Sequence, residues 1–284
     1  MTNGGWNDNA LDADTFDAIA GLAYRESGLQ LVEEKKAMIQ SRLRHRLVAV
    51  GLENFASYAS FVCSQDGVSE RIHMISALTT NVSHFFREKH HFEILTKSVL
   101  APRLAEFSAG ERLRIWSAGC SNGQEPLSIV MSVLEAFPES ADFNFRVLTT
   151  DIDPRVIQFA ATGIYPQRFL GGVPDNLLQK YFEPVDTPEG EGFQASASLL
   201  SRITYRELNL LSSWPLTGLM DAIFCRNVVI YFDQQTQDSL WPKFRQHIHP
   251  QGSLFLGHSE RIAHPSDSRF RANGPTTYLP ICEN

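Results

Sequence analysis

The sequence has few cysteines and no long apolar run, and both features limit the class of protein. The four cysteines, at positions 63, 120, 225 and 282, form no Cys-x-x-Cys pair, which favours free thiols in a reducing compartment. No stretch approaches the ~20 apolar residues of a membrane-spanning helix, so we expect no direct membrane insertion. Residues 1–14 are polar and acidic, unlike a secretory signal peptide. We therefore expect a cytoplasmic protein.

Basic residues are also too few for a general nucleic-acid-binding protein. The chain has 25 Lys and Arg against 32 Asp and Glu, with a net charge of −7 and a pI of about 5.7. Nucleic-acid-binding proteins usually present a basic domain, so we expect no nucleic-acid partner. The histidines at positions 84, 90 and 91 lack a convincing cluster of partner ligands, and we expect no metal site.

What the sequence does contain is a strand, a glycine-bearing turn and a helix between residues 113 and 134. The apolar run at 113–116 is typical of a buried strand, and Pro126 is well placed in the first turn of the helix. Gly119 and Gly123 allow a ligand to approach the backbone closely. The two glycines do not have the Gly-x-Gly-x-x-Gly spacing of a dinucleotide fingerprint, and the turn lacks the lysine of a phosphate loop. A nucleoside ligand without a pyrophosphate fits better, although an ordinary strand-to-helix connection has the same pattern.

The chain as a whole is predicted to form two domains. Apolar residues at helical spacing indicate an all-helical N-terminal domain over residues 1–80, of which residues 1–10 are expected to be disordered. Over residues 81–284, strands alternate with helices, which predicts an α/β domain with a mostly parallel sheet covered on both faces. A turn-rich stretch with short strand patterns predicts a small β subdomain inserted at about 181–201.

Polar residues follow four of the predicted strands. Gly119, Asp151, Asn209 and Asn227 each come directly after an apolar run, so they should meet at the carboxyl edge of the sheet, where such sheets bind ligands. A carboxylate at the end of the second strand can bind both hydroxyls of a ribose, and Asp151 is the candidate. The alternative role for Asp151 is a helix cap, although Asp153, directly before a proline, is the better helix start.

The helix expected over residues 33–50 carries a basic stripe. Lys35, Arg42 and Arg46 are separated by offsets of 7 and 11 residues, which nearly complete whole helical turns. In an acidic protein such a stripe indicates an acidic partner surface, and an ordinary solvated helix face is the other interpretation.

Five motifs together resemble the chemotaxis receptor methyltransferases, the CheR family, from about residue 14 to residue 279. In chain order, these motifs occupy residues 79–87, 116–126, 151–153, 224–232 and 257–260. Members of that family methylate glutamates of methyl-accepting chemotaxis receptors with S-adenosylmethionine and release S-adenosylhomocysteine. Ser83 replaces a common threonine, and residues 122–124 replace a common Thr-Gly-Glu. Both departures keep hydrogen-bonding capacity.

The resemblance implies a Rossmann-like S-adenosylmethionine-dependent methyltransferase domain with a small inserted β subdomain, preceded by an all-helical N-terminal domain. It implies that Lys35, Arg42 and Arg46 bind the cytoplasmic helical bundle of a chemotaxis receptor, and we expect a monomer. Arg87 and Tyr231 would lie nearest the transferring methyl group. The cofactor contacts implied are Asn81, Ser83, Arg87, Gly119, Glu125, Asp151, Asn209, Leu210, Arg226 and Asn227. Among them, Glu125 would meet the methionine ammonium and Asp151 the ribose.

This chemistry needs few catalytic groups. A glutamate side chain has a pKa near ~4.3, so at neutral pH it is already an anionic nucleophile. No general base is required, and alignment in a dry site supplies much of the acceleration. Two other functions stay open: methylation of another protein, an RNA or a small molecule, and a non-catalytic adaptor that senses S-adenosylmethionine. The acidic pI counts against RNA, and the set of Arg87, Asp151 and Tyr231 counts against the adaptor.

The β subdomain bears on how the substrate is found. Some family members bind a receptor's C-terminal pentapeptide there and carry a Gly-x-Gly turn, whose places Val185 and Thr187 occupy here. Branched side chains resist positive φ and block close approach of an added strand. We therefore expect no need for a pentapeptide tether, although Gly190 and Gly192 leave room for a shifted turn.

Overall fold

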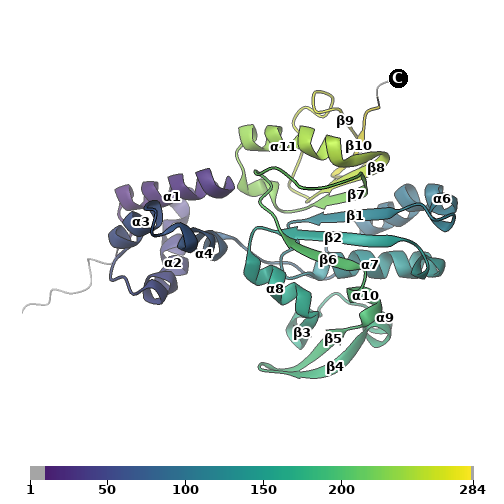
Figure 1. Cartoon of the computed structure of the whole chain (residues 1–284), viewed down its shortest axis with the longest axis horizontal. Helices are drawn as coiled ribbons and strands as arrows, with labels where there is room; N and C mark the ends of the chain where they lie inside the picture. The colour runs from purple at the N-terminus through teal and green to yellow at the C-terminus, as the bar shows by residue number, and fades with distance from the viewer. Residues whose placement is uncertain (1–9, 283–284) are drawn as a thin grey trace, which may run out of the picture. The chain divides into compact units, whose positions relative to one another are not determined.

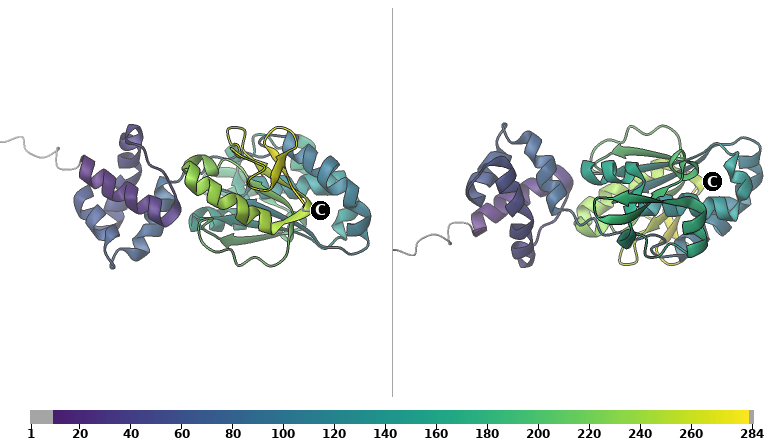
Figure 2. Two further views of the ribbon diagram at one scale, coloured as in Figure 1. Left: turned by 90° about the horizontal axis from the view of Figure 1, so that it is seen from above. Right: turned by 90° about the horizontal axis from the view of Figure 1, so that it is seen from below.

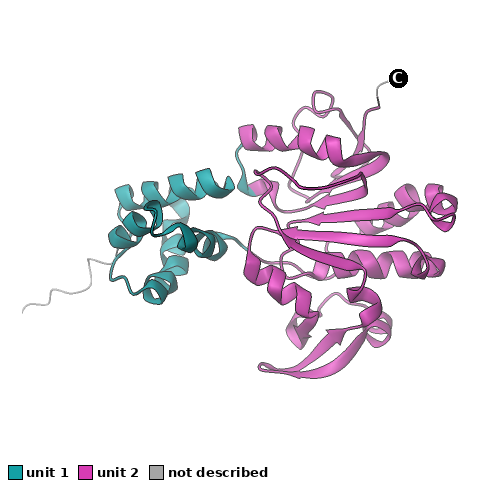
Figure 3. Cartoon of the chain, viewed as in Figure 1, with its two compact units in different colours: residues 1–80, 231–233 teal, residues 81–230, 234–284 magenta. Residues whose placement is uncertain are grey.

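The computed structural model describes residues 10–282, which form two compact units (Figure 3). The first unit contains the chain up to Thr80 together with Tyr231–Asp233, and the second contains Asn81–Ile230 and the chain from Gln234 onward. The disorder expected for residues 1–10 falls almost wholly outside the described residues.

The first unit is helical, and local sequence signals set the ends of its helices. The Asp12 side chain accepts a hydrogen bond from the backbone N–H of Thr15 at 2.8 Å, which caps the first helix. Gly51 ends the second helix in the left-handed conformation, at φ 72°. The helices are α1 Ala13–Ser27, α2 Lys36–Val50, α3 Phe55–Cys63 and α4 Val68–Leu78.

The second unit is built on a seven-stranded sheet in the order β6-β2-β1-β7-β8-β10-β9 (Figure 1). The strands are β1 Leu113–Ala118, β2 Phe145–Asp151, β6 Ile203–Glu207, β7 Met220–Cys225, β8 Ile248–Leu256, β9 Phe270–Ala272 and β10 Thr277–Pro280. The first five in spatial order are parallel, and β10 and β9 add antiparallel pairings at one edge. After β1 the chain forms β2 on one side of β1, and it later forms β7 and β8 on the other side of β1. The end of β1 is therefore the topological switch point of the sheet.

Helices cover both faces of this sheet, as the pattern of β1 illustrates. Ile115 belongs to the same buried cluster as Leu127 of α7, whereas the Trp116 ring lies 5.7 Å from the Phe244 ring of α11. Neighbouring strand residues point to opposite faces, so α7 and α11 cover different faces. The helices are α5 His90–Ile94, α6 Leu104–Ser108, α7 Gln124–Ala136, α8 Pro154–Thr162, α9 Asp175–Tyr181, α10 Ala197–Leu200 and α11 Gln234–His247. None of the helices between residues 10 and 282 is long and apolar enough to cross a membrane.

A second, three-stranded sheet lies beyond the β6 edge of the large sheet (Figures 1 and 2). Its strands, β3 Ile164–Pro166, β4 Phe182–Thr187 and β5 Gly190–Ala195, are ordered β3-β5-β4 and pair antiparallel. The sequence pattern indicates the hairpin of β4 and β5. It does not indicate β3, because three residues are too short to show alternation.

Candidate functional site

The turn after β1, residues 119–123, reaches the loop after β7 at the switch point. Gly119 has φ 92°, and its backbone N–H donates to the carbonyl of Thr150 at 2.8 Å. A Cβ at Gly119 would lie 2.2 Å from Cγ2 of Val228, so a larger residue cannot fit between the two loops. The glycine predicted from the sequence is therefore required by close approach as well as by backbone conformation.

Asp151 lies at the carboxyl end of β2 and is 8% exposed. One carboxylate oxygen accepts the N–H of Ser121 at 2.8 Å, and the other accepts the N–H of Asp153 at 3.0 Å. Burial raises the pKa of Asp151, although these backbone donors act in the opposite direction. The cap of α8 is Asp153, which accepts the N–H of Arg155 at 3.0 Å. Asp151 is thus not a helix cap, and each of its oxygens keeps capacity for a further donor.

Glu125 lies in the first turn of α7, with its side chain 12% exposed. Its carboxylate accepts a hydrogen bond from the Ser117 hydroxyl at 2.7 Å on one oxygen and from Arg226 at 3.1 Å on the other. Burial raises the pKa of Glu125, and Arg226 and Ser117 act in the opposite direction. Strand β1 therefore positions Glu125 through Ser117, and the loop after β7 positions it through Arg226.

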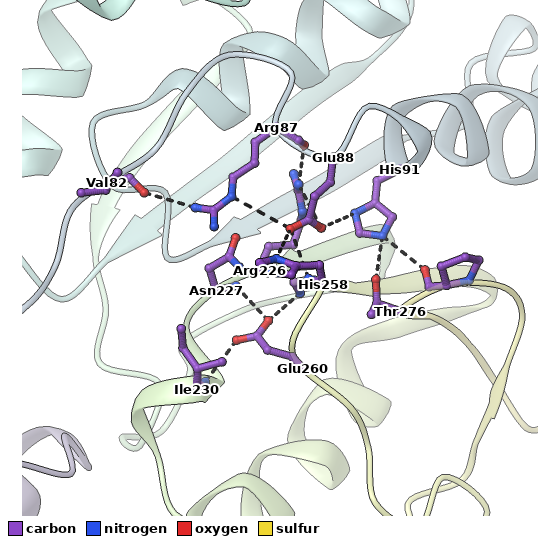
Figure 4. A network of polar contacts seen from close by, with 12 residues as sticks. Val82, Arg87, Glu88, His91, Arg226, Asn227, Ile230, His258, Glu260 and Thr276 are labelled. Carbon is purple, nitrogen blue, oxygen red and sulfur yellow. Dashed lines mark hydrogen bonds and ion pairs between the residues drawn. The ribbon is translucent and has the colours of Figure 1, made fainter. Parts of the chain in front are cut away.

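Arg226 is the cation at the centre of a buried polar network (Figure 4). Its guanidinium, 2% exposed, binds Glu125 through one terminal nitrogen and Glu88 through the other at 3.3 Å. The nitrogen that faces Glu88 also donates to the backbone carbonyl of Arg87, and the guanidinium lies 5.7 Å from the centre of the Phe92 ring. Every one of these contacts fixes the orientation of the Arg226 side chain.

Glu88 is a member of this network that the sequence reasoning missed. It adopts φ 56°, and its side chain is 11% exposed. One oxygen accepts hydrogen bonds from the backbone N–H of His258 at 3.1 Å and from its ring at 3.2 Å, and the other lies 3.4 Å from the His91 ring. Burial raises the pKa of Glu88, but the charge of Arg226 and the His258 donors outweigh burial and hold it below its usual value. Glu88 follows the 79–87 motif directly, and nothing in the local pattern distinguishes it from a surface glutamate.

Glu260, the last residue of the 257–260 motif, joins the loops after β7 and β8. It is 2% exposed and accepts backbone hydrogen bonds from Asn227 at 2.8 Å, Gly257 at 2.5 Å and Ile230 at 3.1 Å (Figure 4). Burial raises its pKa, while the backbone donors act in the opposite direction. Because Asn227 has φ 59°, this carboxylate holds a strained backbone conformation at a predicted cofactor residue.

The remaining predicted residues of the second unit lie on two segments beside these loops. The Asn81 amide donates to Asp153 at 2.9 Å, and Ser83 is half-buried two residues later. The Arg87 guanidinium is 29% exposed, donates to the Val82 carbonyl at 3.3 Å and lies 4.0 Å from Glu88.

The segment after β6 adjoins Asp151, since the Leu208 N–H donates to the Asp151 carbonyl at 2.9 Å. The side chain of Asn209 accepts the Leu211 N–H at 2.9 Å, and Leu210 is buried.

Four predicted residues belong to the first unit. Tyr231 accepts a backbone hydrogen bond from Gln30 at 2.9 Å and groups with the helices. Lys35 is exposed and lies in the 3₁₀ turn Glu33–Lys35, so the helix expected over residues 33–50 begins only at Lys36. Arg42 of α2 donates to the carbonyls of Leu78 and Thr79 at 2.7 and 2.9 Å. Arg46 forms two hydrogen bonds, at 2.8 and 2.6 Å, with the carboxylate of Glu70, which is 4% exposed. Two cations of the predicted stripe therefore stabilise their own unit.

A mostly parallel sheet with a glycine turn at its switch point and an acidic residue at the end of the next strand defines a Rossmann-like, nucleoside-binding domain. The predicted fold class is confirmed. Residues 81–279 match the family described as "CheR methyltransferase, SAM binding domain", and residues 14–79 match "CheR methyltransferase, all-alpha domain". The chain belongs to the CheR methyltransferase family.

Several relatives are similar over nearly their whole length. A probable chemotaxis protein methyltransferase of Rhizobium etli is 42% identical over 257 residues, which span 90% of this chain and 96% of that protein. Chemotaxis protein methyltransferase 2 of Pseudomonas aeruginosa is 37% identical, with 94% and 93% covered. The chemotaxis protein methyltransferase of Escherichia coli is 37% identical, with 95% and 91% covered.

The cofactor of this family's domain is S-adenosylmethionine. The residues present fit such a group, because Asp151 and Glu125 retain acceptor capacity at the carboxyl edge of the sheet. The hydroxyl of Ser121, in the turn between them, is buried without a hydrogen-bond partner among the described residues. A polar ligand would satisfy such a group.

Proposed function

We propose that this protein transfers a methyl group from S-adenosylmethionine to glutamate side chains of methyl-accepting chemotaxis receptors, as a protein-glutamate O-methyltransferase. The products are glutamate methyl esters and S-adenosylhomocysteine. The observation that carries the proposal is a pair of carboxylates at the switch point of the sheet, the buried Asp151 and the largely buried Glu125. Both are anchored by the protein on one side and keep acceptor capacity for a cationic, ribose-bearing cofactor.

Each predicted site residue receives a role in this proposal. Asp151 binds the ribose hydroxyls and Glu125 the methionine ammonium. The ten cofactor contacts are those expected from the sequence: Asn81, Ser83, Arg87, Gly119, Glu125, Asp151, Asn209, Leu210, Arg226 and Asn227. The cofactor supplies an electrophilic methyl group on a positively charged sulfur.

Arg87 is the proposed orienting residue for a carboxylate. Its guanidinium is partly exposed, and its contact with the Val82 carbonyl, at 3.3 Å, is long, so donors remain for a substrate or cofactor carboxylate. Tyr231 is proposed to position the reacting groups. Since the acceptor glutamate is already ionised at neutral pH, no residue of the chain is assigned as a general base.

The proposed partner is the acidic cytoplasmic helical bundle of a receptor. The helical unit would recognise this bundle, and the protein would act as a monomer. Lys35 is exposed and Arg42 is half-buried, so these residues offer charge to a partner to different degrees. Arg44 and His45 are exposed on α2, the helix of Arg42, and extend the basic surface beyond the predicted stripe. Arg46 contributes mainly by holding α2 against α4 through Glu70.

The test is a transfer assay with tritiated S-adenosylmethionine and receptor-containing membranes, in which base-labile label on protein is scored. We expect label on the receptor with the wild-type protein and a large loss with Arg87→Ala at unchanged circular dichroism. Label on another protein, an RNA or a small molecule would overturn the assigned substrate. Cofactor binding without any transfer would favour the non-catalytic adaptor.

A further inference from the structure

The network around Arg226 contains one acidic residue, Glu88, to which the proposed function gives no role. Glu88 and Glu125 bind opposite ends of the same guanidinium, at 3.3 and 3.1 Å. Arg226 is nearly fully buried, so it cannot exchange these partners for water without cost. The residue that binds one end of the Arg226 guanidinium therefore determines the geometry of the ion pair between the other end and Glu125.

The unusual backbone conformation of Glu88 indicates that the contacts of its side chain hold the residue in place. At φ 56° it occupies the left-handed region, which is unfavourable for a residue with a Cβ atom. The carboxylate reaches Arg226 and His91 through one oxygen and both donors of His258 through the other. Burial of His91 lowers its pKa to about 4, so this neighbour is neutral at physiological pH.

Among the groups that form ion pairs with Arg226 or with Glu88, the arginine and glutamate charges balance only when Glu88 is counted. Arg226 and Arg87 supply two positive charges, the latter 4.0 Å from Glu88, and Glu88 and Glu125 supply two negative charges. Neutralising Glu88 would leave a net positive cluster beside Glu125. It would also release one end of Arg226, which could then form a two-point contact with Glu125. Both effects oppose the binding of a cation by Glu125.

We propose that Glu88 is a positioning residue that holds Arg226 away from a full ion pair with Glu125, and so keeps Glu125 available for the ammonium of the cofactor. The proposal rests on the assignment of Glu125 to that ammonium. Glu88 itself does not touch the cofactor in this arrangement. It acts through the geometry and charge of Arg226.

The test compares two ligands that differ in the amino-acid end. S-adenosylhomocysteine carries the ammonium, whereas 5′-methylthioadenosine keeps the nucleoside and thioether but lacks the amino acid. We expect Glu88→Gln to weaken S-adenosylhomocysteine about tenfold by calorimetry, the size of one charge-assisted contact, and to leave 5′-methylthioadenosine unchanged. In transfer kinetics, KM for the cofactor should rise more than kcat falls. Equal weakening of both ligands, or of neither, would overturn the proposal.

Controls separate this idea from a folding defect and from a wrong cofactor assignment. Glu93→Gln removes the same charge from an exposed residue that pairs with Lys97, and should change neither affinity. Glu88→Asp keeps the charge but shortens the reach, and should give a smaller loss of discrimination than Gln; it also serves as the test if Glu88→Gln does not fold. Glu125→Gln should itself discriminate between the two ligands. If it does and the Glu88 variants do not, only the positioning role fails; if it does not, the proposed ammonium contact fails as well.

Discussion

The phenol of Tyr165 donates a 2.8 Å hydrogen bond to the backbone carbonyl of Asn122. Tyr165 belongs to β3 of the small sheet, and Asn122 belongs to the turn after β1, so this bond joins the small sheet to the turn at the proposed cofactor site. The tyrosine is fully buried and packs edge-on against Phe85, with the ring centres 5.4 Å apart. A Cβ at Gly123 would lie 2.8 Å from the Tyr165 oxygen, so the turn and the ring fit closely.

Tyr165→Phe should therefore affect both stability and cofactor binding. Loss of the donor leaves the Asn122 carbonyl without this partner, at a cost of ~1–2 kcal/mol in the free energy of unfolding. We expect S-adenosylhomocysteine to bind several-fold more weakly, measured by calorimetry. Tyr278→Phe is the matched control, because Tyr278 is also buried and its hydroxyl accepts the Ile262 N–H at 3.2 Å in another part of the unit. Equal loss of affinity in both variants would contradict a specific link through Tyr165.

Asp151→Ala should weaken cofactor binding by ~1.5–3 kcal/mol through loss of a charge-assisted contact with the ribose. Part of this loss comes from the turn, because the Ser121 N–H loses its acceptor. Calorimetry with S-adenosylhomocysteine measures the effect. Asp12→Ala, which removes a helix cap in the first unit, should lower stability and leave affinity intact. Unchanged affinity of the Asp151→Ala variant would show that Asp151 is not the carboxylate that binds the ribose.

The cations of the predicted stripe should separate into a recognition role for Lys35, in the turn before α2, and a structural role for Arg46, in α2. Lys35→Glu should lower receptor methylation and leave cofactor affinity unchanged, because it reverses an exposed charge. Arg46→Ala should instead cost ~3 kcal/mol or more in unfolding free energy, since it leaves the Glu70 carboxylate buried without its cation. Thermal unfolding and the transfer assay distinguish the two variants. If Lys35→Glu methylates receptors at the wild-type rate at every salt concentration, the surface at Lys35 is an ordinary solvated face.

Acidification should destabilise the protein through His91. Burial, and then the charge of Arg226, lower its folded pKa from 6.5 to about 4. Between these values the unfolded chain binds a proton that the folded protein does not, so stability falls as pH drops from about 6.5 to about 4, by up to ~3 kcal/mol. His91→Asn should flatten the pH dependence of urea unfolding in this window, whereas His45→Asn, at an exposed site, should not. The lowered pKa of Glu88 acts in the same sense only at lower pH.

The small sheet should not bind a receptor C-terminal pentapeptide. Gly192 lies in the central strand β5, opposite Val185 of β4. A Cβ added at Gly192 would lie 2.4 Å from Cγ2 of Thr187, so the glycine is needed for packing inside the sheet. The edge strand β4 contains Pro184, which has no N–H to offer an added strand. Titration of the protein with such pentapeptides should give no micromolar binding. Affinity that maps to β4 or β5 would reverse the conclusion and imply a tethered enzyme with a higher effective substrate concentration.

Local chemistry in the sequence determined the secondary structure where its signals are strong. The first unit is helical, as the helical spacing of its apolar residues predicts, and the strand before Gly119 and the strand ending at Asp151 lie where apolar runs place them. The sequence also identified the family, because five ordered motifs carry far more information than any one of them. Short elements escaped it: β3 is three residues long and has no period to detect.

Only the tertiary structure decided which charged residues belong together. Sequence spacing places Arg42 and Arg46 on one helical stripe with Lys35. In the structure, however, Arg42 binds carbonyls at the end of α4 and Arg46 binds the carboxylate of Glu70, and these partners lie 24 or more residues away in the chain. Glu88 and Glu260 acquire their importance the same way, since Arg226 and Asn227 approach them only once the strands lie in their spatial order. Periodicity records how a residue faces its own helix or strand. The partner of a buried charge depends on which distant segments of the chain pack together, and no local sequence pattern contains that information.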